Sequence, residues 1–499
     1  MFGNRTPLPA GGAASIQHCL VMQACRPSAQ PCEHRGPACP PTPAFAATLT
    51  PTATPSTPAS APGHASHPWR WIPPLYFAQG LPYVVVMTLA VVMYKNLGVS
   101  NTDIALLTSW LYLPWVIKPL WGPVVDLLGT KRRWIVALQF VVGALLGMVA
   151  LAVPAPAFLQ MTLVLFWLMA FASATHDIAA DGFYMLAQPP SQQAAFVGVR
   201  STFYRLAMIG GQGGLVFLAG HLQERTGQVA MAWAWVFALM AVFFFAVALW
   251  HHFVLPRPSS DRPVPRSRTF FADFAKAFAA FFKRPGMARI LAFLLLYRFA
   301  EAQLLKLVAP FMLDPRSAGG LGLTTQDVGI AYGTFGVGAL TLGGLLGGWL
   351  ISRGGLKKLL WPLVLCMHLP NTVYIALAVW QPVGLVPVAA AIATEQFGYG
   401  LGFTAYMVYM LMIAGGHDGP AGTDGAGGEN PHKTAHYALC TGFMALGMML
   451  PGMWAGWLQD QIGYANFFIW TCVATLPSFA AAALLRIDPN FGRKPDAAP

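Results

Sequence analysis

Charged residues are scarce in this chain, and acidic residues are the scarcest. Only 10% of the 499 residues are charged, with 18 Asp and Glu against 30 Lys and Arg. An average soluble domain carries about 25% charged residues, so this composition excludes an ordinary soluble globular protein. Hydrophobic residues make up 56% of the chain, which predicts a protein that crosses a membrane many times.

Cysteine is also rare, and its placement excludes a disulfide-stapled fold. Three of the seven cysteines, Cys366, Cys440 and Cys472, fall inside apolar stretches, and the other four lie within residues 1–68. Those four lack the close pairing of zinc modules, so neither a metal nor another cofactor is predicted. The sequence contains no HExxH metal pair and no nucleophile elbow, so an enzyme is not expected.

Residues 1–68 contain no apolar run of helical length. They are rich in Pro, Ala, Ser and Thr, and a segment of this kind cannot bury enough apolar surface to fold. We therefore predict a disordered N-terminal tail, and its pattern is not that of a signal peptide.

Long apolar runs occupy the chain from Trp69 to about Arg486. A hydrocarbon core needs about 20 apolar residues per helix. Twelve such stretches lie at 71–95, 103–127, 134–153, 158–187, 195–221, 229–254, 287–312, 326–351, 359–380, 385–413, 435–458 and 465–486. We predict an all-α membrane protein with twelve transmembrane helices in two pseudo-symmetric halves of six. The predicted parts are a first bundle (69–255), a cytoplasmic linker (256–286), a second bundle (287–486) and a cytoplasmic tail (487–499).

Basic residues gather on one side of the predicted membrane. Runs such as 131–133 and 357–358 lie on that side, whereas the other side has only Lys95, Arg225 and Arg316. Basic loops stay in the cytoplasm, so both termini and the Gly-rich loop 415–433 are expected there. The net charge of +12 then reflects topology, and no nucleic-acid partner is expected.

One basic loop carries a motif that recurs once in the chain. Its residues are Gly122, Asp126, Gly129 and Lys131. The same spacing returns 226 positions later as Gly348, Ser352, Gly355 and Lys357. A fixed offset indicates an internal duplication. The glycines would let helices approach closely, and the Asp would pair with a cation or a helix N-terminus. The motif resembles the signature loop of the major facilitator superfamily, which implies a gating role for the four residues.

Few ionisable side chains lie inside the predicted helices. Each costs about 2.5–3.5 kcal/mol at the bilayer centre on insertion scales, so each should face the bundle interior with a partner or a purpose. Asp177 and Asp181 share one helix face at i and i+4. Two close carboxylates resist double ionisation, so one tends to hold a proton. The pair is interpreted either as a proton-coupling site or as a static pair held by Arg205. Glu301 and Glu395 are the next candidates for the proton.

Six runs resemble the bacterial muropeptide permeases and their relatives, which include the acetyl-coenzyme A transporters of the endoplasmic reticulum. The runs are LYFAQGLP (75–82), SATHDIAADGF (173–183), YRLAM (204–208), LYRFAEA (296–302), EQFGYGLGFTAY (395–406) and KTAHYAL (433–439). The resemblance implies the major facilitator fold and proton-driven import of anhydro sugar peptides at the bacterial inner membrane. His176 and the Gly-rich loop depart from that family. The alternatives are a proton-coupled exporter, a transporter of a drug, sugar or acyl-CoA-like solute, and a sensor that does not transport.

Aromatic and cationic side chains suit a substrate site between the two halves. The expected binding residues are Tyr76, Gln79, Arg205, Arg298, Tyr399 and Tyr406. The tyrosines can stack on sugar rings, although plain helix packing is the simpler explanation for any one of them. The arginines can bind a substrate carboxylate through two hydrogen bonds. The expected partners are a small-molecule substrate, protons and the lipid bilayer, and the protein is expected to be a monomer.

Overall fold

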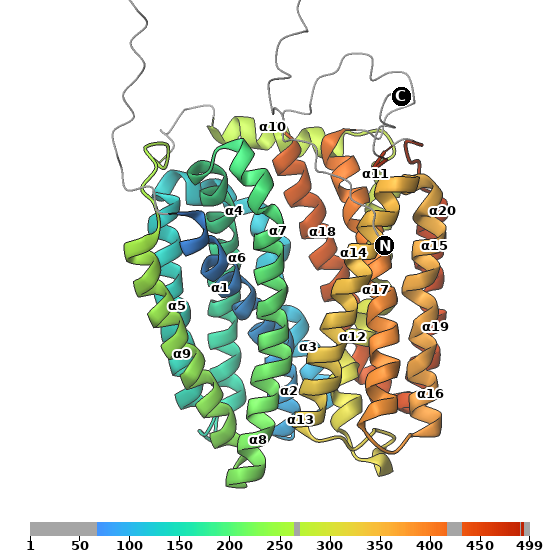
Figure 1. The fold of residues 1–499 in the computed structure, drawn as a ribbon. Helices are drawn as coiled ribbons and strands as arrows, with labels where there is room; N and C mark the ends of the chain where they lie inside the picture. Colours follow the sequence, from blue (N-terminus) through green and yellow to red (C-terminus); the bar gives the residue numbers. More distant parts are fainter. Residues whose placement is uncertain (1–66, 264–269, 417–431, 490, 494–499) are drawn as a thin grey trace, which may run out of the picture. The chain divides into compact units, whose positions relative to one another are not determined.

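The computed structural model describes residues 67–263, 270–416, 432–489 and 491–493. Within these ranges the chain is helical almost throughout and contains no strand (Figure 1). Eight runs of helix there are long and apolar enough to cross a membrane. The prediction of an all-α membrane protein is confirmed, and the element order is consistent with twelve spans. Nearly all of the predicted tail and most of loop 415–433 lie outside the described residues.

The first half is built from six helical stretches that follow the predicted runs. Its elements are η1 (Pro68–Arg70), α1 (Ile72–Val84), η2 (Val85–Leu89), α2 (Ala90–Asn96), α3 (Asn101–Trp110), α4 (Leu113–Leu128), α5 (Lys131–Ala152), α6 (Phe158–Ala187), α7 (Pro190–Ile209), η3 (Gly210–Leu215), α8 (Val216–Thr226) and α9 (Val229–Val254). Hydroxyl caps set two of the starts, because Ser100 accepts from the Asp103 N–H and Thr130 from the Arg133 N–H.

The linker helix and the second half follow the same plan. The elements are α10 (Phe270–Phe282), α11 (Met287–Leu296), α12 (Phe299–Leu313), η4 (Arg316–Ala318), α13 (Thr325–Val328), η5 (Gly329–Gly336), α14 (Val337–Gly354), α15 (Leu356–His368), η6 (Leu369–Asn371), α16 (Thr372–Trp380), α17 (Leu385–Gly415), α18 (Lys433–Met453), α19 (Ala455–Val473) and α20 (Leu476–Ala483). Gly463 turns the chain inside α19 with φ of 74°, a left-handed conformation that favours glycine. This turn separates the last two predicted spans.

Two breaks inside the predicted spans of the second half place polar residues in the interior. Arg298 lies between α11 and α12 with a non-helical ψ of 19°. Pro370 lies in η6, between α15 and α16. Proline removes a backbone donor from a helix, and such breaks persist in membranes where neighbouring helices satisfy the freed groups. Broken helices thus bring Arg298 and Asn371 into the bundle.

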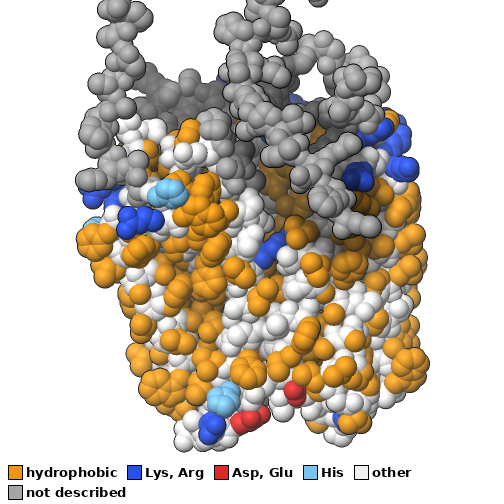
Figure 2. Space-filling model, in the orientation of Figure 1, with side chains coloured by type: hydrophobic (Ala, Val, Ile, Leu, Met, Phe, Trp, Pro, Cys, Tyr) orange, Lys and Arg blue, Asp and Glu red, His pale blue; other side chains and the backbone are white. Residues whose placement is uncertain are grey.

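The helices of the first half, coloured blue to green, lie on one side of the molecule, and those of the second half, coloured yellow to red, lie on the other (Figure 1). The helix α10 lies across one end of both sets. Figure 2 shows hydrophobic side chains over the middle of the viewed face, with Lys and Arg side chains gathered toward the α10 end. Exposed apolar side chains such as Trp235, Val242 and Leu345 suit contact with lipid.

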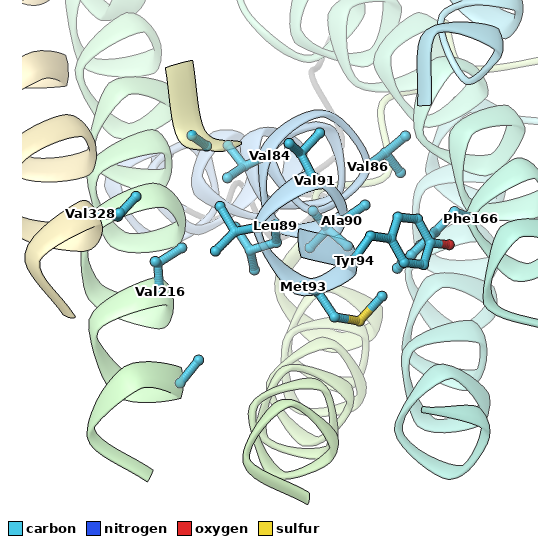
Figure 3. Close-up of a cluster of buried hydrophobic side chains, with 14 of the residues drawn as sticks. Val84, Val86, Leu89, Ala90, Val91, Met93, Tyr94, Phe166, Val216 and Val328 are labelled. Carbon is cyan, nitrogen blue, oxygen red and sulfur yellow. The ribbon is translucent and has the colours of Figure 1, made fainter. Parts of the chain in front are cut away.

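Glycine lets the two halves touch at the end far from α10. A Cβ on Gly456 would lie 2.0 Å from the Asn101 carbonyl oxygen, and one on Gly333 would lie 2.1 Å from the Gln212 carbonyl oxygen. Backbone of α19 therefore meets α3, and η5 meets η3, at distances that exclude any side chain. The nearby buried core joins the halves as well, since Val216 of α8 lies opposite Val328 of α13 (Figure 3).

Polar bonds reinforce this closed end. Lys95 forms an ion pair of 2.6 Å with Asp314, and Asn101 donates to the same carboxylate at 3.2 Å. Thr102 donates to Asp460 at 2.6 Å. Each bond joins an element of the first half to one of the second, so the halves are fastened together at the end far from α10.

Candidate substrate and proton site

A tyrosine, a carboxylate and an arginine meet inside the first half. Asp181 on α6 forms an ion pair of 2.6 Å with Arg200 on α7 and accepts from the Tyr76 hydroxyl of α1 at 3.3 Å. The Arg200 guanidinium lies 4.5 Å from the centre of the Tyr76 ring and 4.8 Å from that of Tyr184. Such cation–π contacts stabilise the arginine in an apolar bundle. Asp181 still exposes 44% of its side chain, and Tyr437 of α18 is close enough to interact with it electrostatically. The cluster therefore faces the second half.

The second carboxylate of the predicted pair has a different cation. Asp177 pairs with Lys118 of α4 at 3.5 Å. The prediction that Arg205 is the counter-charge of these two carboxylates is wrong. Arg205 instead donates to the Thr341 hydroxyl of α14 at 3.4 Å, which places its guanidinium between the halves.

Arg298 is the corresponding cation of the second half. It is buried, donates to the Tyr399 hydroxyl of α17 and lies 5.4 Å and 5.0 Å from the ring centres of Tyr399 and Phe403. Its Nε atom has no hydrogen-bond partner within the described residues. The arginine therefore keeps a free donor toward the interior, beside two aromatic rings of the kind that bind sugars.

Two buried glutamates in the same region have carboxyl oxygens without hydrogen-bond partners among the described residues. Glu301 on α12 is 0% exposed, and neither of its oxygens has a hydrogen-bond partner in the described part of the chain. Glu395 on α17 is also 0% exposed. One of its oxygens accepts from the Tyr374 hydroxyl at 3.0 Å and from the Gln396 amide at 2.9 Å. All three residues, Arg298, Glu301 and Glu395, are buried, and Glu301 lies within electrostatic reach of both Arg298 and Glu395.

Three further tyrosines complete this region, and sequence reasoning missed them. Tyr83 and Tyr112 of the first half lie within electrostatic reach of Arg298. Tyr332 of η5 lies within reach of Glu301, Glu395 and Tyr399. The halves therefore meet around Arg298. A tyrosine inside an apolar run is a weak signal, because most such residues only pack.

Lys306 also marks the interface of the halves. Its Nζ donates to the Thr108 hydroxyl of α3 at 2.9 Å and lies 5.1 Å from the Tyr112 ring centre. Its charge inside an apolar helix was the signal that could have assigned it to the site.

Two further predicted binding residues, Tyr406 and Gln79, differ in how their polar groups are used. The Tyr406 hydroxyl donates to the Leu294 carbonyl at 2.6 Å, and its ring stacks on Tyr297 with centres 5.0 Å apart. Gln79 is buried on α1, and its side-chain oxygen has no partner among the described residues. Gln79 can therefore still accept a bond from a ligand, whereas Tyr406 already donates its proton.

The signature loop holds the linker between the halves. The Lys131 and Arg132 backbone N–H groups, at the start of α5, donate to the two oxygens of Asp261 at 2.7 Å and 3.0 Å. A carboxylate is stabilised at a helix N-terminus. Lys131 also lies over Gly182, where a Cβ would be 2.8 Å from its Cε atom.

The glycines of this loop do not both act as expected. Gly129 ends α4 beside Trp134, but a Cβ on Gly122 would meet open space, so the expected close helix approach there is wrong. The side chain of Asp126 lies outside the described residues.

A chain of polar side chains crosses the core of the first half. The Gln139 amide lies 3.1 Å from His176 and 2.9 Å from His251, and all three residues are buried. The described residues contain no group of three or more His, Cys, Asp and Glu that could hold a metal ion. Gln139 therefore links one ring nitrogen of each histidine, and the three residues form part of the packing of α5, α6 and α9.

Comparisons of the sequence and the fold with known proteins all point to membrane transporters. The sequence profile of the Major Facilitator Superfamily matches residues 74–422. The chain is 24% identical over 435 residues to the anhydromuropeptide permease of Escherichia coli (strain K12), which covers 85% of this chain and 80% of the permease. It is 24% identical over 437 residues to the transporter named AmpG 4 of Rickettsia conorii, covering 83% and 96% of the two chains. The crystal structure of the nucleoside transporter NupG superposes with a TM-score of 0.59 at 17% identity, covering 83% and 98%.

Proposed function

The chain belongs to the major facilitator superfamily, and from this we propose that it imports anhydro sugar peptides from cell-wall turnover together with protons. As a member of that family it is a multi-pass membrane transporter and not an enzyme. The proposed location is the bacterial inner membrane, with both termini in the cytoplasm. The name of the Escherichia coli relative supports the substrate class, since the similarity extends over most of both chains.

The observation that carries the proposal is that each half holds one arginine against tyrosine rings in the interior. Each half presents a cation held against tyrosine rings, Arg200 in the first and Arg298 in the second. A muropeptide combines sugar rings, amides and carboxylates. Aromatic faces suit the rings and arginine suits the carboxylates. The proposed binding residues are the six predicted ones, Tyr76, Gln79, Arg205, Arg298, Tyr399 and Tyr406, and Arg200, which the structure adds.

Alternating access accounts for the closure at one end. The contacts between α3 and α19, and between η3 and η5, join the halves far from α10. Rocking the halves about the central residues would open that end and close the other, which is how paired repeats move a substrate past a fixed site. Under the proposed orientation the closed end faces the periplasm. We assign gating to the signature loop, residues Gly122, Asp126, Gly129 and Lys131.

Proton coupling is assigned to the interior carboxylates. Asp177, Asp181, Glu301 and Glu395 are the candidates. A proton moving with the substrate must be held inside the bundle during the change of access. Buried carboxyl groups are able to hold it there.

Uptake into proteoliposomes tests the proposal. The purified full chain would be reconstituted and supplied with radiolabelled anhydromuropeptide, with and without an imposed pH gradient. Accumulation above the external concentration that collapses with a protonophore is expected. An equally labelled nucleoside, sugar and acyl-CoA serve as the comparison. Accumulation of one of those solutes instead, or movement of the muropeptide against the proton gradient, would contradict the proposal.

A further inference from the structure

Arg298 and Glu301 lie one helical turn apart, yet they are not bonded to each other. Arg298 is the N-cap residue of α12, and Glu301 lies in its first turn. The ion pairs found among the described residues do not include these two. The guanidinium turns instead to Tyr399 and Phe403 on α17. The arginine thus has an aromatic partner while the adjacent carboxyl group has none.

Glu301 lies in surroundings that do not support a lone negative charge. Its side chain is fully buried, and its oxygens lack hydrogen-bond partners in the described ranges. The titratable groups within electrostatic reach are Arg298 beside it, Glu395 and Tyr399 on α17, Tyr332 on η5 and Tyr374 on α16. Burying an unpaired carboxylate costs several kcal/mol, which the neutral acid largely avoids. In this conformation Glu301 is therefore stable as the protonated acid.

The carboxylates of the first half contrast with it. Asp181 has Arg200 at 2.6 Å and Asp177 has Lys118 at 3.5 Å. In each case a cation lies beside the carboxylate and compensates its charge. Among these four acids, the two glutamates of the second half are the ones without an ion pair in the described ranges. Glu395 differs from Glu301 by its bonds to Tyr374 and Gln396.

We infer that Arg298 alternates between Tyr399 and Glu301, and that the protonation of Glu301 decides which partner it has. The N-cap residue and the third residue of a helix lie close together, as in a capping box, so a change of side-chain rotamer is enough to bring the guanidinium to the carboxylate. The inference rests on the proposed function and adds to it the group that is recognised, a carboxylate of the substrate, and the residue that couples its binding to the proton.

The two states give symport directly. With Glu301 neutral, Arg298 stays on Tyr399, and its free Nε–H is available to a substrate carboxylate. When the Glu301 O–H bond breaks and the proton passes to water on the α10 side, the carboxylate formed competes with the substrate for Arg298. Substrate and proton then leave together. A proton from the opposite side restores the neutral acid after reopening, so charge and protons balance over one cycle.

Infrared spectroscopy tests the protonation state without any substrate. The full chain in proteoliposomes would be compared with Glu301→Gln at neutral pH in the region of the protonated carboxyl stretch. A band present in the parent, lost in Glu301→Gln and kept in Asp181→Asn is expected. Absence of that band in the parent would overturn the inference.

Tyr399→Phe tests whether Arg298 changes partner between Tyr399 and Glu301, and it does not depend on whether Glu301→Gln folds. The variant keeps the ring but removes the hydroxyl that holds Arg298, which frees the arginine to pair with Glu301. The infrared band of the protonated carboxyl should then disappear at lower pH than in the parent. A band that titrates as in the parent would overturn the exchange. Tyr94→Phe, whose hydroxyl bonds to the Thr162 hydroxyl within the first half, is the matched control.

Transport of radiolabelled anhydromuropeptide supplies the second readout. Glu301→Gln fixes the neutral state, so accumulation under a pH gradient should fall at least about tenfold while exchange across the membrane persists. Full accumulation by Glu301→Gln would refute the role of Glu301. If the parent itself does not transport the muropeptide, the proposed function fails, whereas the infrared result still decides whether Glu301 is protonated and whether Arg298 exchanges.

Discussion

Removing the Asp314 carboxylate should open the closed end of the transporter. Asp314 receives two bonds from the first half, the ion pair with Lys95 at 2.6 Å and the hydrogen bond from Asn101 at 3.2 Å. Both bonds exist only while this end is closed. Hydrogen bonds to charged groups contribute about 1.5–3 kcal/mol each, and partial exposure reduces this, so the loss is about 2–4 kcal/mol. The closed state would lose population by about 30- to 900-fold relative to the open one.

Labelling of a buried cysteine measures this shift. Ser109 on α3 is fully buried near Gly452 at the closed end, so Ser109→Cys in a cysteine-free chain reports on opening. An impermeant thiol reagent applied from the side opposite α10 should react much faster with Asp314→Ala than with the parent. Asp327→Asn is the matched control, because Asp327 caps α13 within its own half. Equal labelling rates in Asp314→Ala and the parent would refute the gate.

Three further perturbations test other parts of the structure. Asp261→Ala removes two hydrogen bonds to the start of α5, which lowers the stability of the linker contact by about 1–2 kcal/mol. Proteolysis of linker 256–286 should therefore become faster, and an unchanged rate would count against the contact. Gly456→Ala places a methyl group against the Asn101 carbonyl, so uptake should fall more than about tenfold at normal expression. Gly214→Ala, whose methyl group meets open space, should transport normally. Equal uptake by the two variants would contradict the tight closure. Gln139→Leu leaves two buried histidines without their partner, which should lower the free energy of unfolding by roughly 2–5 kcal/mol. The Tm should fall accordingly, and an unchanged Tm would show that the bonds contribute nothing.

The fold was predictable because membranes impose a strong pattern on sequence. Apolar runs of about 20 residues mark helices, and the helical elements follow the predicted runs closely. The breaks were harder to place. Arg298 interrupts a run that composition alone extends from 287 to 312, because the helix end there depends on what the arginine contacts on α17.

The partners of the interior charges were less predictable, as the two arginines of α7 illustrate. Arg200 and Arg205 are five residues apart, which corresponds to a rotation of about 140° around a helix. Only one of them can face α6, and spacing within α7 cannot say which. The packing of α7 against α1 and α14 decides it, so Arg200 meets Asp181 and Arg205 meets Thr341. Sequence thus identified the charged residues but not their pairing.

The i and i+4 rule also led to the wrong emphasis among the acids. It drew attention to Asp177 and Asp181, which share a face of α6. In the structure each of them forms an ion pair with its own cation, whereas Glu301 forms none among the described residues. Burial and hydrogen bonding, which depend on neighbouring helices, therefore separate the acids in a way that spacing cannot.

Proton movement driven by substrate tests the central claim of coupled import most directly. Proteoliposomes holding a pH-sensitive dye would be prepared without a pH gradient, and anhydromuropeptide would be added outside. The account predicts acidification of the interior in the parent, at a rate that follows uptake of the label, and little acidification in Glu301→Gln. Entry of the muropeptide into parent vesicles with no change of internal pH would contradict it.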